Sequence, residues 1–201
     1  LAFLIEQEWL HLRGNHERQL LTQTPDQMGL SDLYAYQTLA AADRTWLEQL
    51  PSTAAIGAEI FLCHGSPSDD SLYLLETIAD GRARLASQQE ISTRLGEEQA
   101  PVVLCGHSHI PRIVASGRGQ LLVNPGSVGL QAYDDIAPVP HVMETGSPNA
   151  RYAILERYGN EWKAELAAIP YDHHRAAQQA RSNGREDWAI ALESGYFSWL
   201  M

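Results

Sequence analysis

The sequence has little positive charge, few cysteines and no long apolar run. Its 14 Lys and Arg residues stand against 25 Asp and Glu residues, giving a formal net charge of −11 at pH 7. Because nucleic-acid backbones and anionic membranes attract Lys and Arg, this balance excludes a broad nucleic-acid or membrane-binding face. No run approaches the roughly 18 apolar residues of a membrane-spanning helix, so we expect no membrane partner. A small phosphorylated substrate held by a metal ion remains compatible with this charge.

The two cysteines, Cys63 and Cys105, are too few for a disulfide framework. Each stands just before a histidine motif, so a structural Cys/His zinc site has to be weighed. Adjacent strand residues face opposite sides, which separates Cys63 from His64, and one remaining thiol does not make a structural zinc site. We therefore expect buried, reduced cysteines, which are typical of a reducing compartment and predict a cytoplasmic protein.

The composition is that of an ordinary globular protein. A length of 201 residues, with 44% hydrophobic and 19% charged residues, fits one domain with a full core. No internal repeat and no linker divides the chain. We predict a single domain over residues 1–201.

The stretch Pro101–His109 reads as a buried strand followed by two histidines. Its apolar run is β-branched and short, and Gly106 ends it where the backbone bends. Side chains two apart on an extended backbone point the same way, so His107 and His109 should face one spot while Ser108 faces away. Two imidazoles at a strand end suggest a metal site, although this motif alone also fits a pair of hydrogen-bonded polar residues.

The same pattern occurs twice more along the chain. Ile60–Gly65 is an apolar run that ends in His64, and Trp9–Glu17 is a strand-like run that ends in Gly-Asn-His at residues 14–16. Three strand ends therefore carry imidazole or amide groups. Neutral imidazoles with an amide oxygen, and without thiolate, favour Mn, Fe, Co, Ni or Zn over Ca or Mg.

In this order, these motifs resemble those of the calcineurin-like metallophosphoesterases. The matching stretches are Gly14-Asn15-His16-Glu17, His64-Gly65, Gly106-His107-Ser108-His109 and Asn124-Pro125-Gly126-Ser127-Val128-Gly129. The last is similar to a stretch of small bacterial and archaeal phosphodiesterase-type members. The resemblance implies an α/β fold with two mixed β-sheets packed face to face and helices on the outside. It also implies metal-dependent hydrolysis of phosphoester bonds, as a phosphodiesterase or a phosphatase, by a metal-bound hydroxide.

The resemblance further implies a binuclear centre with two divalent transition-metal ions (Mn²⁺, Fe²⁺/³⁺, Zn²⁺, Ni²⁺ or Co²⁺). Asn15, His64 and His107 would bind one ion and His109 the other. His16 would face the phosphate, where it would stabilise the transition state or protonate the leaving oxygen. Arg112, close to a motif, is a candidate substrate-binding residue.

One part of the family pattern is missing. The family begins with Asp-x-His on its first strand and Gly-Asp on its second, and neither lies upstream of Gly14. We expect that the chain lacks N-terminal βα units. The alternative is a catalytically degenerate scaffold or binding module of the same fold.

The remaining elements follow from hydrophobic period and turn signals. Asp69 and Asp70 should occupy a helix N-terminus, His141 should be solvated, and the apolar tail should pack on the body or on a second copy in a homodimer. The expected hairpins are Thr53–Ile56 with Glu59–Cys63, Pro111–Ser116 with Gln120–Val123, and Tyr152–Tyr158 with Trp162–Ile169. The other expected segments are a strand Trp9–Leu12, helices Leu33–Leu50, Leu72–Ile78, Arg84–Gly96, Asp172–Arg181 and Glu186–Glu193, a surface loop Leu130–Ala150, and the tail Tyr196, Phe197, Trp199 and Leu200.

Overall fold

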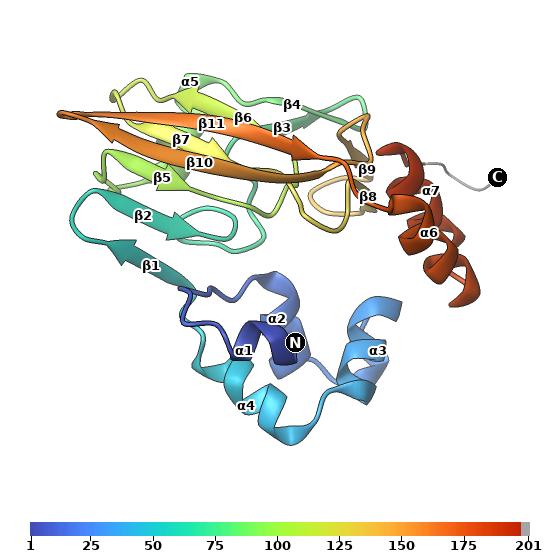
Figure 1. The fold of residues 1–201 in the computed structure, drawn as a ribbon. Coiled ribbons are helices and arrows are strands. Elements are labelled where there is room, and N and C mark those ends of the chain that lie inside the picture. Colours follow the sequence, from blue (N-terminus) through green and yellow to red (C-terminus); the bar gives the residue numbers. More distant parts are fainter. Residues whose placement is uncertain (198–201) are drawn as a thin grey trace.

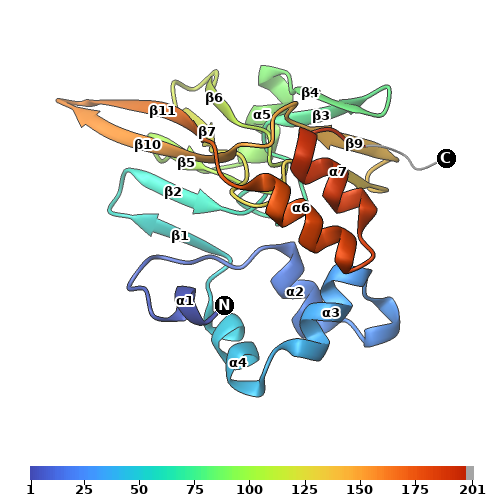
Figure 2. The same cartoon turned by 45° about the vertical axis from the view of Figure 1, so that its right-hand side comes forward.

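The structure of the protein, a computed structural model, describes residues 1–197. A group of short helices at the N-terminus lies below the edge strand β1, and two C-terminal helices lie at another side of the strand-rich part (Figures 1 and 2). No helix among the described residues has both the length and the apolar character needed to cross a bilayer. The N-terminal helices are α1 (Ala2–Ile5), α2 (Asn15–Thr22), the 3-10 helix η1 (Pro25–Gln27), α3 (Leu30–Thr38) and α4 (Ala41–Gln49).

Two predictions for this N-terminal part are wrong. Residues 9–12 form no strand, because no neighbouring strand pairs with them, and Trp9 is 58% exposed. The single helix expected over Leu33–Leu50 is divided between α3 and α4. The backbone is extended at residues 39 and 40, and the Asp43 carboxylate accepts the N–H of Ala40 at 2.9 Å, which starts α4 as a new helix.

A five-stranded mixed sheet forms the centre of the molecule. Its order is β1-β2-β5-β7-β6; β2, β5 and β7 run parallel, and the two edge pairs are antiparallel. Both hairpins expected here are confirmed. The strands are β1 (Thr53–Ile56), β2 (Ile60–Cys63), β5 (Val102–Leu104), β7 (Leu121–Asn124) and β6 (Arg112–Ala115).

The core lies on one face of this sheet, under helix α5 (Gln88–Leu95). Ser87 caps that helix by accepting the N–H of Glu90 at 3.3 Å, and Gly96 ends it with φ +59°. Helix and sheet are held together by burial of apolar area, at about 25 cal/mol per Å². The core cluster comprises Cys63, Leu74, Leu75, Ala86, Ile91, Leu95, Val103, Cys105 and Leu122.

A second mixed sheet occupies segments for which helix and loop were expected. It has the order β3-β4-β9-β8, with β4 and β9 parallel. Three predictions are therefore wrong: the helix Leu72–Ile78, the first part of the helix Arg84–Gly96, and the surface loop Leu130–Ala150. Four-residue strands show no clear period, and their partners lie far away in sequence. The strands are β3 (Glu76–Ala79), β4 (Arg82–Leu85), β9 (His141–Glu144) and β8 (Ala132–Asp135).

The elements of the C-terminal part form close to where the sequence predicts them. The expected hairpin forms from β10 (Ala150–Tyr158) and β11 (Glu161–Ile169). Residues of β10 line one groove together with residues of β2, β5 and β7. Helices α6 (His173–Ser182) and α7 (Glu186–Ser194) are confirmed. Trp199 and Leu200 of the expected tail lie outside the described residues. The α/β prediction with mixed sheets and outer helices is confirmed.

Candidate metal and phosphoester site

The site lies where three parallel strands end. His64 follows β2, the Gly106–His109 turn follows β5, and Asn124 ends β7. Because these strands are parallel, their carboxyl ends meet at one edge of the sheet. Helix α2 brings Asn15 and His16 to the same edge. The structure thus brings five predicted site residues together around one cavity of about 320 Å³: Asn15, His16, His64, His107 and His109.

Asn15 and His64 are in direct contact. The Oδ1 atom of Asn15 lies 2.9 Å from Nε2 of His64. Gly14 makes this approach possible, since a Cβ atom at that position would lie 2.7 Å from the imidazole ring. Because an amide oxygen only accepts, the N–H at Nε2 of His64 is the donor of this hydrogen bond. The two side chains are also close enough to serve as neighbouring ligands of one ion.

The Gly106–His109 turn differs from the extended backbone expected from the sequence. His107 has φ +29° and His109 has φ +58°, in the left-handed region that non-glycine residues rarely adopt. The turn is held from β7, since Nδ2 of Asn124 donates to the carbonyl of Gly106 and to Oγ of Ser108. The two rings therefore reach the cavity through a strained turn, and simple strand alternation is the wrong explanation for their convergence.

Backbone carbonyls fix the tautomers of both rings. Nε2 of His107 lies 3.1 Å from the carbonyl of Ser71, and Nδ1 of His109 lies 2.9 Å from the carbonyl of Leu130. A carbonyl only accepts hydrogen bonds, so each of these nitrogens carries the proton. The other nitrogen of each ring keeps its lone pair, which is the arrangement that metal-binding histidines use.

Two tyrosines and a buried histidine support His107 from behind. The Tyr73 ring stacks on His107 with centroids 4.7 Å apart, and its hydroxyl lies 2.9 Å from Nε2 of His141. The Tyr133 hydroxyl donates to the carbonyl of His107 at 3.0 Å. His141 is 1% exposed, so the expectation of a solvated side chain is wrong. This histidine belongs to β9 and completes a buried network under the turn.

Burial keeps the imidazoles uncharged. It lowers the pKa of His64 to about 4, with a smaller contribution from His109. Burial likewise lowers the pKa of His107 and that of His109 to about 4. All three rings are neutral at pH 7, with a lone pair available for a cation.

The two cysteines take no part in metal binding. Both are buried and free, as expected. Burial raises the pKa of Cys63 to about 12 and that of Cys105 well above its ordinary value, so both thiols stay protonated. Within residues 1–197 neither thiol belongs to a group of three or more His, Cys, Asp or Glu side chains that could hold an ion.

His16 stands at the cavity mouth with a 63% exposed side chain. Its Nδ1 lies 2.8 Å from Oδ1 of Asp32, whose side chain is 11% exposed. This carboxylate accepts a hydrogen bond from the N–H at Nδ1, so the Nε2 atom of the ring is not engaged by it. Sequence reasoning missed Asp32, because it lies in the first turn of α3 and no local motif indicates its contact with His16.

Arg112 is not brought to the site. Its Nε donates to the buried carboxylate of Glu76 at 2.8 Å, and it does not line the imidazole cavity. Burial raises the pKa of Glu76. The helix expected after Asp69 and Asp70 is also absent. Asp70 instead accepts two hydrogen bonds from Arg18, at 2.7 and 2.8 Å.

The donor set fits one transition-metal ion and does not fit two. Asn15, His64 and His107 supply one amide oxygen and two neutral imidazoles, and the two rings lie 5.1 Å apart between centroids. Within residues 1–197, however, no group of three or more His, Cys, Asp or Glu side chains is placed to hold an ion. His109 would be the lone donor to a second ion. The described residues therefore bring the predicted ligands to one cavity without completing a binuclear donor set.

Comparison with solved structures gives the same architecture. A metallophosphoesterase from Sphaerobacter thermophilus superposes with a TM-score of 0.69 at 18% identity, covering 97% of this chain and 80% of that one. A hypothetical protein, PH1004, from Pyrococcus horikoshii OT3 gives a TM-score of 0.69 at 15% identity, covering 98% and 77%. At these identities the likeness concerns the fold. No curated protein matches the chain.

The sequence itself matches a family model over most of its length. Residues 3–145 fit the calcineurin-like phosphoesterase superfamily domain, a family that generally uses divalent metal ions. This range contains Asn15, His16, His64, His107 and His109. The chain therefore belongs to the calcineurin-like phosphoesterase superfamily.

Proposed function

We propose that the protein hydrolyses a phosphoester bond of a small phosphorylated substrate in the imidazole cavity, with the help of a divalent transition-metal ion. The observation that carries the proposal is the meeting of Asn15, His64 and His107 in one cavity, in neutral form, in a chain of this family. When bound, the ion would supply positive charge that offsets the charge of the phosphate and polarises its oxygens. Mn²⁺ is the first ion to test.

The chain's own residues would orient the substrate and move a proton. Asp32 fixes the His16 ring through Nδ1 and can stabilise its imidazolium form. In that form the second proton, on Nε2, would pass to the leaving oxygen at the cavity mouth and leave the ring neutral. Tyr133 and Trp188 line the cavity with aromatic surface, which suits the organic part of an ester. His109 keeps a free nitrogen beside the same cavity and would contact the phosphate or a further ion.

A scaffold or binding module of the same fold is the second candidate. The absence of a three-donor His, Cys, Asp or Glu group among residues 1–197 favours it. Under this proposal the fold binds partners and turns over no phosphoester. The buried, protonated thiols of Cys63 and Cys105 fit a reducing compartment in either case, and we propose the cytoplasm.

Hydrolysis of aryl phosphates separates the two candidates. Metal-stripped protein, resupplied with Mn²⁺, should hydrolyse an aryl phosphodiester or monoester. His64→Ala should lose at least about a hundredfold of this rate, because a ligand is removed. His174→Ala, on the exposed surface of α6, is the matched control and should retain the rate. Equal rates for wild type and His64→Ala would contradict hydrolysis in this cavity and leave the scaffold.

A further inference from the structure

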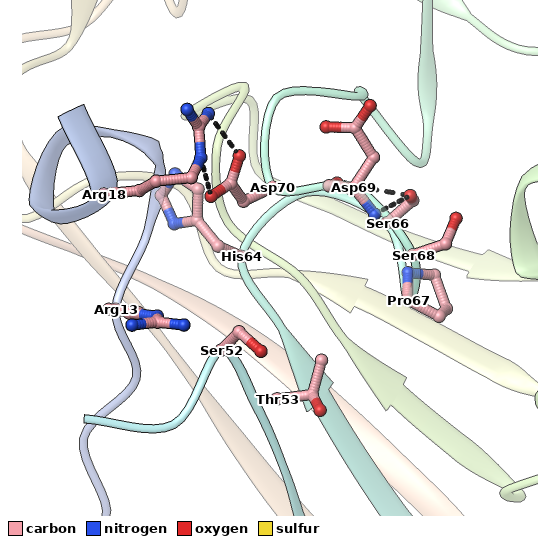
Figure 3. Close-up of a pocket in the computed structure, with 10 residues that line it drawn as sticks. All are labelled: Arg13, Arg18, Ser52, Thr53, His64, Ser66, Pro67, Ser68, Asp69 and Asp70. Carbon is pink, nitrogen blue, oxygen red and sulfur yellow. Dashed lines mark hydrogen bonds and ion pairs between the residues drawn. The ribbon is translucent and has the colours of Figure 1, made fainter. Parts of the chain in front are cut away.

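A second pocket lies on the other side of His64. It has a volume of about 290 Å³ and opens between the segment before α2, the start of β1 and the loop after β2 (Figure 3). His64 lines both this pocket and the imidazole cavity, so the two are neighbours. We refer to it as the Arg13 pocket. Its lining residues are Arg13, Arg18, Ser52, Thr53, His64, Ser66, Pro67, Ser68, Asp69 and Asp70.

Most charges in this pocket are already paired. Arg18 donates to Asp70 through two nitrogens, at 2.7 and 2.8 Å, and these hydrogen bonds hold the pKa of that carboxyl below its ordinary value. Oδ1 of Asp69 accepts the N–H of Ser71 at 2.8 Å. In Figure 3 the Asp70 carboxylate points toward Arg18, and the Asp69 carboxylate lies on the far side of the loop from Arg13. Neither acidic residue therefore neutralises Arg13.

Arg13 is the unpaired cation of the pocket. Within residues 1–197 its guanidinium has no carboxylate partner. The residue is half-buried, and its side chain extends from the coil before α2 toward Ser52 (Figure 3). A half-buried guanidinium gives up part of its hydration, and an anion that accepts its hydrogen bonds replaces what is lost.

We propose that the Arg13 pocket binds a non-reacting phosphoryl group of the substrate, with Arg13 as its main ligand. The substrate class is then a compound with two or more linked phosphoryl groups, whose reacting group lies in the imidazole cavity. This inference rests on the proposed function. Planar guanidinium donors match phosphate oxygens in pairs, and the exposed hydroxyls of Ser52 and Ser68 add further donors.

The two sites beside His64 differ in aromatic lining, and this difference indicates which end of the substrate each would bind. None of the ten described residues lining the Arg13 pocket is Phe, Tyr or Trp, so it offers less aromatic surface to a base or aryl ring than the imidazole cavity does. The imidazole cavity is lined by Tyr133, Trp188 and Phe197. The phosphoryl tail would therefore point toward Arg13 and the organic group toward α7 and β8.

The Arg13 side chain is not needed to anchor its segment. The backbone N–H of Arg13 donates to the carbonyl of Pro51 at 3.0 Å, and this bond survives any side-chain substitution. Arg13→Gln therefore removes the charge and leaves the anchor in place. Ser68→Glu tests the same pocket differently, because it adds negative charge at an exposed position. The control is Arg175→Gln on α6, which removes one exposed positive charge away from the pocket.

The test is calorimetric binding of inorganic pyrophosphate and orthophosphate to metal-free protein in chelator. We expect wild type and Arg175→Gln to bind pyrophosphate more tightly than orthophosphate. Arg13→Gln and Ser68→Glu should each weaken pyrophosphate binding by about tenfold or more, since charge-assisted hydrogen bonds are lost or opposed. Unchanged affinity in Arg13→Gln, or no binding by wild type, would overturn the proposal.

This readout is independent of turnover. Arg13-dependent pyrophosphate binding without any hydrolysis of aryl phosphates would support the pocket while contradicting the proposed function. Hydrolysis that depends on His64, together with pyrophosphate binding that ignores Arg13, would support the proposed function and overturn the pocket.

Discussion

The two hollows on either side of His64 are built in opposite ways. The imidazole cavity collects neutral rings whose pKa values burial lowers to about 4, and its one arginine, Arg185, is paired with Asp187 at 2.6 Å. The Arg13 pocket is polar and keeps an unpaired guanidinium. This edge of the sheet therefore carries two neighbouring sites of different chemistry, the imidazole cavity and the Arg13 pocket. Under the two proposals, one side offers lone pairs to a cation and the other offers positive charge to an anion.

The largest effect that separates the two sides is acid sensitivity of folding. His64, His107 and His109 have pKa values of about 4 in the folded protein against an ordinary 6.5. Between these values the unfolded chain binds more protons, so the free energy of unfolding should fall as pH decreases from 6.5 to 4. At about 1.4 kcal/mol per pKa unit, the loss is on the order of several kcal/mol.

Urea unfolding in chelator, at pH 7 and pH 5, measures this loss. His109→Gln should show a smaller drop than wild type, whereas Arg13→Gln should show the same drop, because it keeps all three buried imidazoles. A free energy of unfolding that is flat across the window would contradict neutral, buried imidazoles.

Next in size is the effect of Gly14→Ala. The added Cβ would lie 2.7 Å from the His64 ring, which is too close, so the ring has to move. The substitution changes no charge, so its effect is steric. We expect Mn²⁺ affinity and aryl phosphate hydrolysis to fall by about 100-fold. Pyrophosphate binding by the Arg13 pocket should change much less. Gly29→Ala, where nothing lies within 4 Å of an added Cβ, is the matched control. Unaltered Mn²⁺ affinity in Gly14→Ala would show that His64 binds no ion.

A smaller effect is expected from Tyr73→Phe. The hydroxyl lies 2.9 Å from Nε2 of His141, and the substitution leaves that buried nitrogen without its partner. The free energy of unfolding should fall by about 1–3 kcal/mol. Thermal or urea unfolding measures the change, with Tyr34→Phe on the exposed face of α3 as the control. Equal losses in the two variants would mean that the buried network contributes nothing specific.

The smallest effect concerns salt. Pyrophosphate binding through the partly exposed Arg13 should weaken several-fold between about 0.05 and 0.5 M NaCl, because the interaction is screened. Mn²⁺ binding by the more buried imidazoles should change less over the same range. Salt titrations of both affinities measure the contrast. The comparison fails if the two ligands respond equally.

Local motifs made the imidazole cavity predictable from the sequence. His64, His107 and His109 each follow an apolar run that forms a strand end, and the parallel order of β2, β5 and β7 brings those ends together. Asn15 was found through its neighbours in the same motif, although the strand expected before it does not form. A chain segment without a pairing partner cannot hold a strand, whatever its composition.

Groups that act through tertiary contacts were not predictable. Asp32 reaches His16, and His141 reaches Tyr73 from a segment expected to be a solvated loop. The pairing of Arg112 with Glu76 likewise joins residues far apart in the chain, and nothing in the local sequence indicates it. The Arg13 pocket depends likewise on Asp70 pairing with Arg18, and this contact links residues far apart in the chain.

The most direct test of the account is a calorimetric titration of Mn²⁺ into metal-stripped protein, comparing wild type with His64→Ala. The account predicts that one Mn²⁺ ion binds per protein molecule, at Asn15, His64 and His107. His64→Ala should weaken this binding by at least about tenfold. Binding that is absent in wild type, or equally tight in His64→Ala, would contradict the claim that these side chains meet around a cation.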